Sequence, residues 1–170
     1  PILGSALKEP DPVIFFEHCN LYNMEGELDG DAGRVDIDHA RILRKGRDIS
    51  VITYSLNVHK ALEAAATLGS EGIDCEVVDL RTLRPLDEST ILESVGRTHR
   101  AIVVDEGWRS VGLAAEISAR IMEQAFYDLD APVVRICSAE TPMPYAKHLE
   151  IAALPQPETI CRAARSLKGK

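Results

Sequence analysis

Short apolar runs alternate with amphipathic segments along most of this chain, a pattern typical of a layered α/β domain. Most of the apolar runs are rich in Val, Ile and Leu and predict buried strands. The amphipathic segments repeat apolar residues three and four positions apart and predict helices. The expected strands are 40–44, 49–54, 75–80, 101–105 and 133–137, and the expected helices are 58–70, 88–95, 112–125 and 158–167.

The continuous apolar character of the strands predicts a sheet that is buried on both faces, with helices on either side. Combined with right-handed crossovers, this gives an α/β fold: a three-layer α/β/α sandwich around a mostly parallel, doubly wound sheet. A short turn at Gly46 joins 40–44 to 49–54, so we expect these two strands to form an antiparallel pair at one edge. Asp87 is the expected N-cap of helix 88–95, and Gly96 its expected end.

The sequence before residue 39 departs from this regular pattern. Val13–Glu17 is a short apolar run after a proline and predicts one strand. Residues 26–38 are rich in glycine and acidic side chains and predict a linker. We therefore expect three parts: 1–25 as the tail end of a preceding domain, 26–38 as the linker, and 39–170 as the α/β domain. A start at Pro1 suggests a piece of a longer polypeptide.

Composition and charge exclude several classes of protein. With 27 acidic and 19 basic residues the net charge is −8, whereas a nucleic-acid-binding domain needs a concentrated basic surface. No apolar run approaches the ~20 residues that span a bilayer. The four cysteines are far apart and form no metal-binding motif. This usage fits a reducing compartment such as the bacterial cytoplasm or the mitochondrial matrix.

Polar residues at the expected carboxyl ends of the strands are the first candidates for chemistry, because open α/β sheets bind ligands there. These residues are Ser55, Asp79, Arg81, Asp105 and Glu106. Three carboxylates could hold Mg²⁺, but helix capping and pairing with a nearby arginine are commoner roles, and we favour them. Gly107 and Gly112 do not have the G-x-G-x-x-G spacing, and the five histidines are scattered. We expect no catalytic, cofactor-binding or metal-binding residue in this chain.

The helix expected at 112–125 is apolar on more than one face. That excess predicts burial against the sheet on one side and contact with another subunit on the other, and the alternative is a helix that is buried entirely within its own domain. The residues that we expect at a subunit interface are Leu113, Ile117, Arg120 and Ile121.

Five blocks carry a resemblance to a known family. They are EGIDCEVVDLRTLRPLD at 71–87, VVDEGW at 103–108, AAEISARIME at 114–123, LDAPVVRI at 129–136 and PMPYAKHLE at 142–150. In order and spacing, over about residues 35–168, the chain resembles the C-terminal domain of the beta subunits of pyruvate dehydrogenase, within the transketolase superfamily. PMPYA favours the pyruvate enzymes, whereas VIFFE at 13–17 also suits their branched-chain relatives.

The resemblance implies a role in assembly. In this family the thiamine ring is activated in the preceding pyrimidine-binding domain, and the alpha subunit holds the diphosphate and its Mg²⁺, so neither cofactor is expected on this domain. The expected partners are the alpha subunit, a second beta subunit and the peripheral binding domain of the dihydrolipoyl acyltransferase. For that docking, the resemblance points to Asp130 in the LDAP turn and to Arg135.

Other functions stay open on the sequence alone. The chain could belong to a branched-chain or acetoin dehydrogenase, to a transketolase-type enzyme, or to a stand-alone oligomerisation module. Its basic end, Leu167-Lys168-Gly169-Lys170, also departs from relatives that end on an apolar residue and use it in docking.

Overall fold

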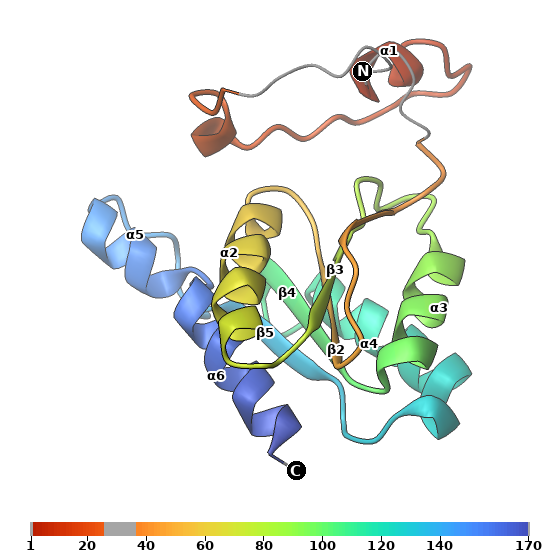
Figure 1. The fold of residues 1–170 in the computed structure, drawn as a ribbon. Coiled ribbons are helices and arrows are strands. Elements are labelled where there is room, and N and C mark those ends of the chain that lie inside the picture. Colours follow the sequence, from red (N-terminus) through yellow and green to blue (C-terminus); the bar gives the residue numbers. More distant parts are fainter. Residues whose placement is uncertain (1, 26–36, 170) are drawn as a thin grey trace.

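A five-stranded sheet forms the centre of the computed structural model, which describes residues 2–25 and 37–169 (Figure 1). The strands are β1 (Arg41–Arg44), β2 (Ile49–Thr53), β3 (Cys75–Asp79), β4 (Ala101–Trp108) and β5 (Val134–Ser138). Their order across the sheet is β1-β3-β2-β4-β5, and only β1 runs antiparallel to its neighbour. The helices are α1 (Ile2–Ala6), α2 (Asn57–Ser70), α3 (Glu88–Thr98), α4 (Leu113–Ala125), α5 (Lys147–Ala153) and α6 (Pro157–Lys168).

Two apolar cores lie on opposite faces of the sheet. On one face α2 and α6 pack against alternate strand residues such as Val51 and Val77. On the other face α3 and α4 pack against the next residue of each of these strands, Ile52 and Val78. Successive strand side chains point to opposite faces, so strands buried on both sides must be apolar throughout. The predicted three-layer α/β/α sandwich with one antiparallel edge strand is confirmed.

The partner of the antiparallel edge strand differs from the prediction. β1 pairs with β3, where Ile42 lies opposite Val78, and β3 separates β1 from β2. The connection passes across the start of β3, where the backbone amides of Arg47 and Asp48 donate to the carbonyl of Asp74. A side chain at Gly46 would collide with the backbone of β3, so this crossing requires glycine.

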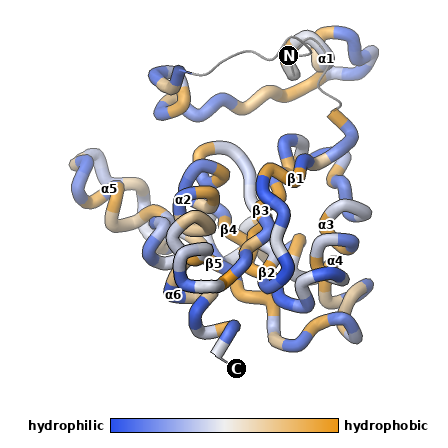
Figure 2. Tube along the Cα trace, viewed as in Figure 1, coloured by the Kyte–Doolittle hydropathy of each residue, from blue (hydrophilic) through white to orange (hydrophobic). Residues whose placement is uncertain are grey.

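Other local predictions are also corrected. Residues 13–17 form no strand: they lie in an extended segment away from the sheet (Figure 2). The side chains of Val13 to Phe16 are exposed. Helix α3 continues past Gly96 to Thr98 and ends where His99 adopts a left-handed conformation. The short helix α5 was not predicted. Of the expected linker 26–38, residues 26–36 lie outside the described residues. None of the helices in the described ranges is both long and apolar enough to cross a membrane.

Asp87 caps α3, as predicted, and this role gives the fold a defined sensitivity to acid. Burial acts to raise the pKa of Asp87, but hydrogen bonds outweigh it and lower the pKa from 3.8 to about 2. The donors are the hydroxyl and backbone amide of Thr90, the hydroxyl of Ser89 and the amide of Ala40, which ties β1 to α3.

A depressed carboxyl pKa contributes stability that is present above its unfolded value and is lost as the pH falls toward the folded value. We expect Asp87→Asn to lower the free energy of unfolding by about 2 kcal/mol at neutral pH, and this deficit to vanish by a pH of about 2. Urea titrations of both proteins over this range measure the difference. Parallel pH profiles would contradict the assignment.

Candidate functional site

The predicted docking residue Asp130 lies in an exposed turn between the 3-10 turn η2 (Phe126–Asp128) and β5. Its side chain is 54% exposed, and its carboxylate forms an ion pair with Arg100 at 3.1 Å. The backbone amide of Asp130 donates to the carbonyl of His99 at 2.8 Å, and the ring of His99 contacts the carbonyl of Asp128 at 2.7 Å. The turn is therefore fixed to the end of α3 and presents its carboxylate at the surface.

Arg135 lies on β5, the edge strand on the other side of the sheet from β1. Its guanidinium donates to the carbonyl of Arg109 at 3.1 Å, and Arg109 donates to the carbonyl of Arg135 at 2.9 Å. Together with Arg162 of α6 they line an open groove along the outer edge of the sheet. No hydrogen bond or ion pair among the described residues joins Arg135 to Asp130, since each has another polar partner.

Helix α4 divides the four predicted interface residues into two groups. Ile117 and Ile121 are 1% and 0% exposed and belong to the chain's own core, which leaves them no surface for a partner. Leu113 is half-buried beside the same core. Arg120 is partly exposed on the side of α4 that faces α3, where it pairs with Glu116 at 2.7 Å and with Glu88 of α3.

An exposed apolar group at the end of α4 was missed by the sequence analysis. It consists of Met122, Phe126 and Tyr127, and the two rings pack edge to face with centroids 5.3 Å apart. The four-residue spacing of Met122 and Phe126 was the available signal, because it places both on a different side of the helix from Ile117 and Ile121.

Asp105, at the carboxyl edge of the sheet, has a structural role. One carboxylate oxygen accepts from the Tyr54 hydroxyl and the Gly107 amide, both at 2.8 Å, and the other accepts from the Ala114 amide of α4 at 3.0 Å. Burial is the main cause that raises the pKa of the Tyr54 hydroxyl, and its hydrogen bond to Asp105 is the second. A side chain at Gly112 would collide with the carbonyl of Trp108, so this glycine serves a tight turn.

Asp79 and Arg81 also act locally. Asp79 accepts from the Arg81 amide at 3.2 Å and pairs with its guanidinium at 3.7 Å, while burial raises the pKa of Asp79. Within residues 2–25 and 37–169, no group of three or more His, Cys, Asp or Glu side chains is arranged to hold a metal ion. Asp105 caps α4 and Asp79 pairs with Arg81, and these are the capping and pairing roles that we favoured.

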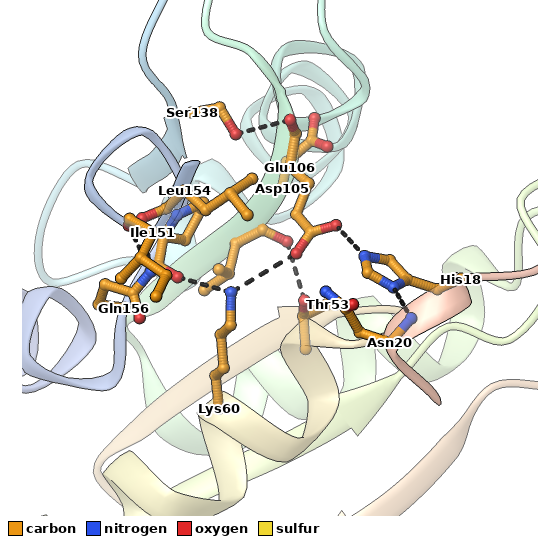
Figure 3. A network of polar contacts seen from close by, with 12 residues as sticks. His18, Asn20, Thr53, Lys60, Asp105, Glu106, Ser138, Ile151, Leu154 and Gln156 are labelled. Carbon is orange, nitrogen blue, oxygen red and sulfur yellow. Dashed lines mark hydrogen bonds and ion pairs between the residues drawn. The ribbon is translucent and has the colours of Figure 1, made fainter. Parts of the chain in front are cut away.

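Glu106 is different, because it reaches a segment distant in sequence (Figure 3). One carboxylate oxygen lies 3.0 Å from Nε2 of His18, and the other lies 3.5 Å from Nζ of Lys60. The ammonium of Lys60 also donates to the carbonyl of Pro155 at 2.8 Å. This cluster joins the N-terminal segment, β4, α2 and the connection between α5 and α6.

Comparisons with known proteins give a matching family model and a series of similar proteins. The family model for the transketolase C-terminal domain matches residues 38–160. The chain is 48% identical over 169 residues to the beta subunit of acetoin:2,6-dichlorophenolindophenol oxidoreductase from Cupriavidus necator, covering 99% of this chain and 50% of that protein. It is 44% identical over 168 residues to the mitochondrial pyruvate dehydrogenase E1 component subunit beta of Dictyostelium discoideum, covering 96% and 47%.

Among solved structures, the chain is similar to a split gene transketolase described as an inactive beta4 tetramer. The TM-score is 0.71 at 23% identity, and the match covers 85% of this chain and 46% of that one. At this identity the likeness supports the fold alone. The chain spans about half the length of the curated relatives it matches.

Proposed function

The chain belongs to the transketolase C-terminal domain family, and from that membership we propose that it is the assembly and docking domain of the beta subunit of a thiamine-diphosphate-dependent 2-oxoacid dehydrogenase. The observation that carries the proposal is the similarity to such beta subunits along 96% to 99% of the chain. The strand-end residues agree with it, because Asp105 and Asp79 are used in capping and pairing rather than in an open catalytic site.

Among the described residues, those at the carboxyl edge of the sheet do not fit thiamine diphosphate with its Mg²⁺. A diphosphate site needs oxygen ligands for the metal and donors for the phosphates. The buried carboxylate of Asp105 already accepts three hydrogen bonds from the protein, and it occupies the start of α4. We therefore assign both cofactors to other parts of the complete enzyme.

For the contact with a second beta subunit, we propose the exposed surface of α4 and of the 3-10 turn η2 that follows it. Leu113 and Arg120 are partly exposed on α4, and Met122, Phe126 and Tyr127 are exposed at its C-terminal end. Aromatic residues, Met and Arg are enriched at protein interfaces. The alpha subunit is the other proposed partner within the enzyme.

For the acyltransferase, we propose that Asp130 receives a basic residue of the peripheral binding domain. The carboxylate is exposed, its backbone is fixed by His99, and the net charge of −8 favours a basic partner. Arg135 is retained as a second contact, on the groove that it shares with Arg109 and Arg162.

For the substrate we propose pyruvate, with acetyl transfer to lipoamide. For the location we propose the mitochondrial matrix or the bacterial cytoplasm, because the similar proteins include mitochondrial and bacterial ones. The alternative is acetoin, which the 48% identity to the Cupriavidus necator protein favours. Because this domain contains no residue assigned to substrate binding, the choice depends on the remainder of the enzyme.

Turnover by the complete enzyme tests the proposal. The full-length beta subunit, expressed with its alpha subunit, should reduce 2,6-dichlorophenolindophenol with pyruvate at a kcat/KM at least about tenfold above that with acetoin. Omission of thiamine diphosphate should abolish both rates. Faster turnover of acetoin would transfer the assignment to that substrate, and thiamine-dependent turnover of neither would contradict the proposed function.

A further inference from the structure

We propose that His18, Glu106 and Lys60 form a latch that fixes the N-terminal segment across the carboxyl ends of β2 and β4. The three side chains come from three parts of the chain and are 20%, 22% and 15% exposed, respectively. A hydrogen bond and an ion pair with so little exposure are weakened by solvent far less than contacts on the open surface. These contacts alone define the latch, and its consequence for assembly rests on the proposed function.

The hydrogen bonds around His18 determine which ring nitrogen carries the proton. Nδ1 accepts from the backbone amide of Asn20 at 3.2 Å and thereby caps the 3-10 turn η1 (Cys19–Leu21). A nitrogen that accepts in this way is unprotonated, so Nε2 carries the hydrogen and donates it to Glu106. One ring thus shapes the segment and attaches it to the domain.

Glu106 is incompletely satisfied without this segment. Its oxygen on the Lys60 side is buried and receives no hydrogen bond within the described part of the chain, having only the ammonium at 3.5 Å. Its other oxygen has His18 as its donor. A carboxylate held in such surroundings gains strongly from a charge-assisted donor, which gives the segment a specific place to bind.

Lys60 connects the latch to the loop between α5 and α6. Its bond to the carbonyl of Pro155 lies between α5 and α6, where Gln156 also donates to the carbonyls of Ile151 and Leu154 (Figure 3). The segment, the sheet edge and this connection are therefore linked through one carboxylate. If 1–25 leads out of a preceding domain, the latch sets the direction in which that domain leaves.

A double-mutant cycle on the 170-residue chain tests the latch. His18→Asn keeps an N-cap acceptor for η1 but cannot reach Glu106, whereas Glu106→Ala removes the acceptor. Each variant should speed hydrogen exchange at the amides of Leu21 and Tyr22 about tenfold, and the double variant should exchange no faster than either single one. The matched control is Glu123→Ala on α4, which should leave these amides unchanged.

Exchange in β2 and β4 should remain slow in every variant, which separates release of the segment from loss of the fold. Rates at Leu21 and Tyr22 within twofold of the parent in both single variants would overturn the proposal. So would effects that multiply in the double variant, because independent residues behave in that way. Either failure would leave the proposed enzymatic function untouched, since turnover tests that separately.

Discussion

Replacing Asp105 with alanine should lower the free energy of unfolding by about 3 to 5 kcal/mol. Asp105 is 1% exposed, and its carboxylate receives three hydrogen bonds, from Tyr54 after β2, Gly107 of β4 and Ala114 of α4. Its removal leaves the amides of Gly107 and Ala114 and the Tyr54 hydroxyl without their acceptor, and each unsatisfied buried donor costs about 1 to 3 kcal/mol. It also opens a space next to the first turn of α4.

Comparison of Asp105→Asn with Asp105→Ala separates the loss of the capping hydrogen bond from the loss of side-chain volume. Asp105→Asn keeps an acceptor for Tyr54 and Gly107, but its amide group faces the Ala114 amide, so we expect a loss intermediate between the parent and Asp105→Ala. Urea denaturation followed by circular dichroism measures all three proteins. A loss below about 1 kcal/mol in Asp105→Ala would show that water replaces the carboxylate, and would reopen this residue as a functional candidate.

The layers of the fold were predictable because each strand is buried on both faces. Val51 and Ile52 enter different cores, so the run that contains them has to be apolar throughout, and that is visible in the sequence. Helix α2 was equally visible, since Ala61, Ala65 and Leu68 all meet one core at helical spacing.

The order of the strands was not predictable from local signals. The short turn at Gly46 favoured a hairpin, but the position beside β2 is taken by β3, which arrives later through the α2 crossover. The collision that makes Gly46 necessary is with Cys75 and Glu76, about thirty residues away, so no local rule contains it. Likewise, the Val13–Glu17 run has the composition of a strand, yet no strand of the described residues pairs with it.

The candidate sites were predictable only as residue types. Asp130 was correctly placed in a turn, but its exposure and its pairing with Arg100 depend on the packing of two distant connections. Helix α4 shows the same limit, because an apolar surplus does not say which residues the core takes. Ile117 and Ile121 enter it, and Met122 remains outside.

Reversing the charge of Asp130 should weaken binding of the acyltransferase's peripheral binding domain at least about a hundredfold, and Asp130→Ala about thirtyfold. The first change replaces attraction with repulsion, whereas the second only removes one partner. Calorimetric titration of the complete decarboxylase with that domain measures both. Asp128→Lys is the matched control, because it carries the same charge change two residues away and only its backbone carbonyl contacts His99.

The ion pair between Asp130 and Arg100 makes a further outcome decisive. Arg100 partly neutralises the Asp130 carboxylate, which a basic partner would bind. Docking must therefore share the carboxylate with Arg100 or displace Arg100 from it. If Asp130 is the docking residue, Arg100→Met should therefore tighten binding at low salt, while the same change in an Asp130→Ala background should have no effect. If the pair is instead only a brace for the turn, Arg100→Met will weaken binding or leave it unchanged, and Asp130→Lys will behave like its control.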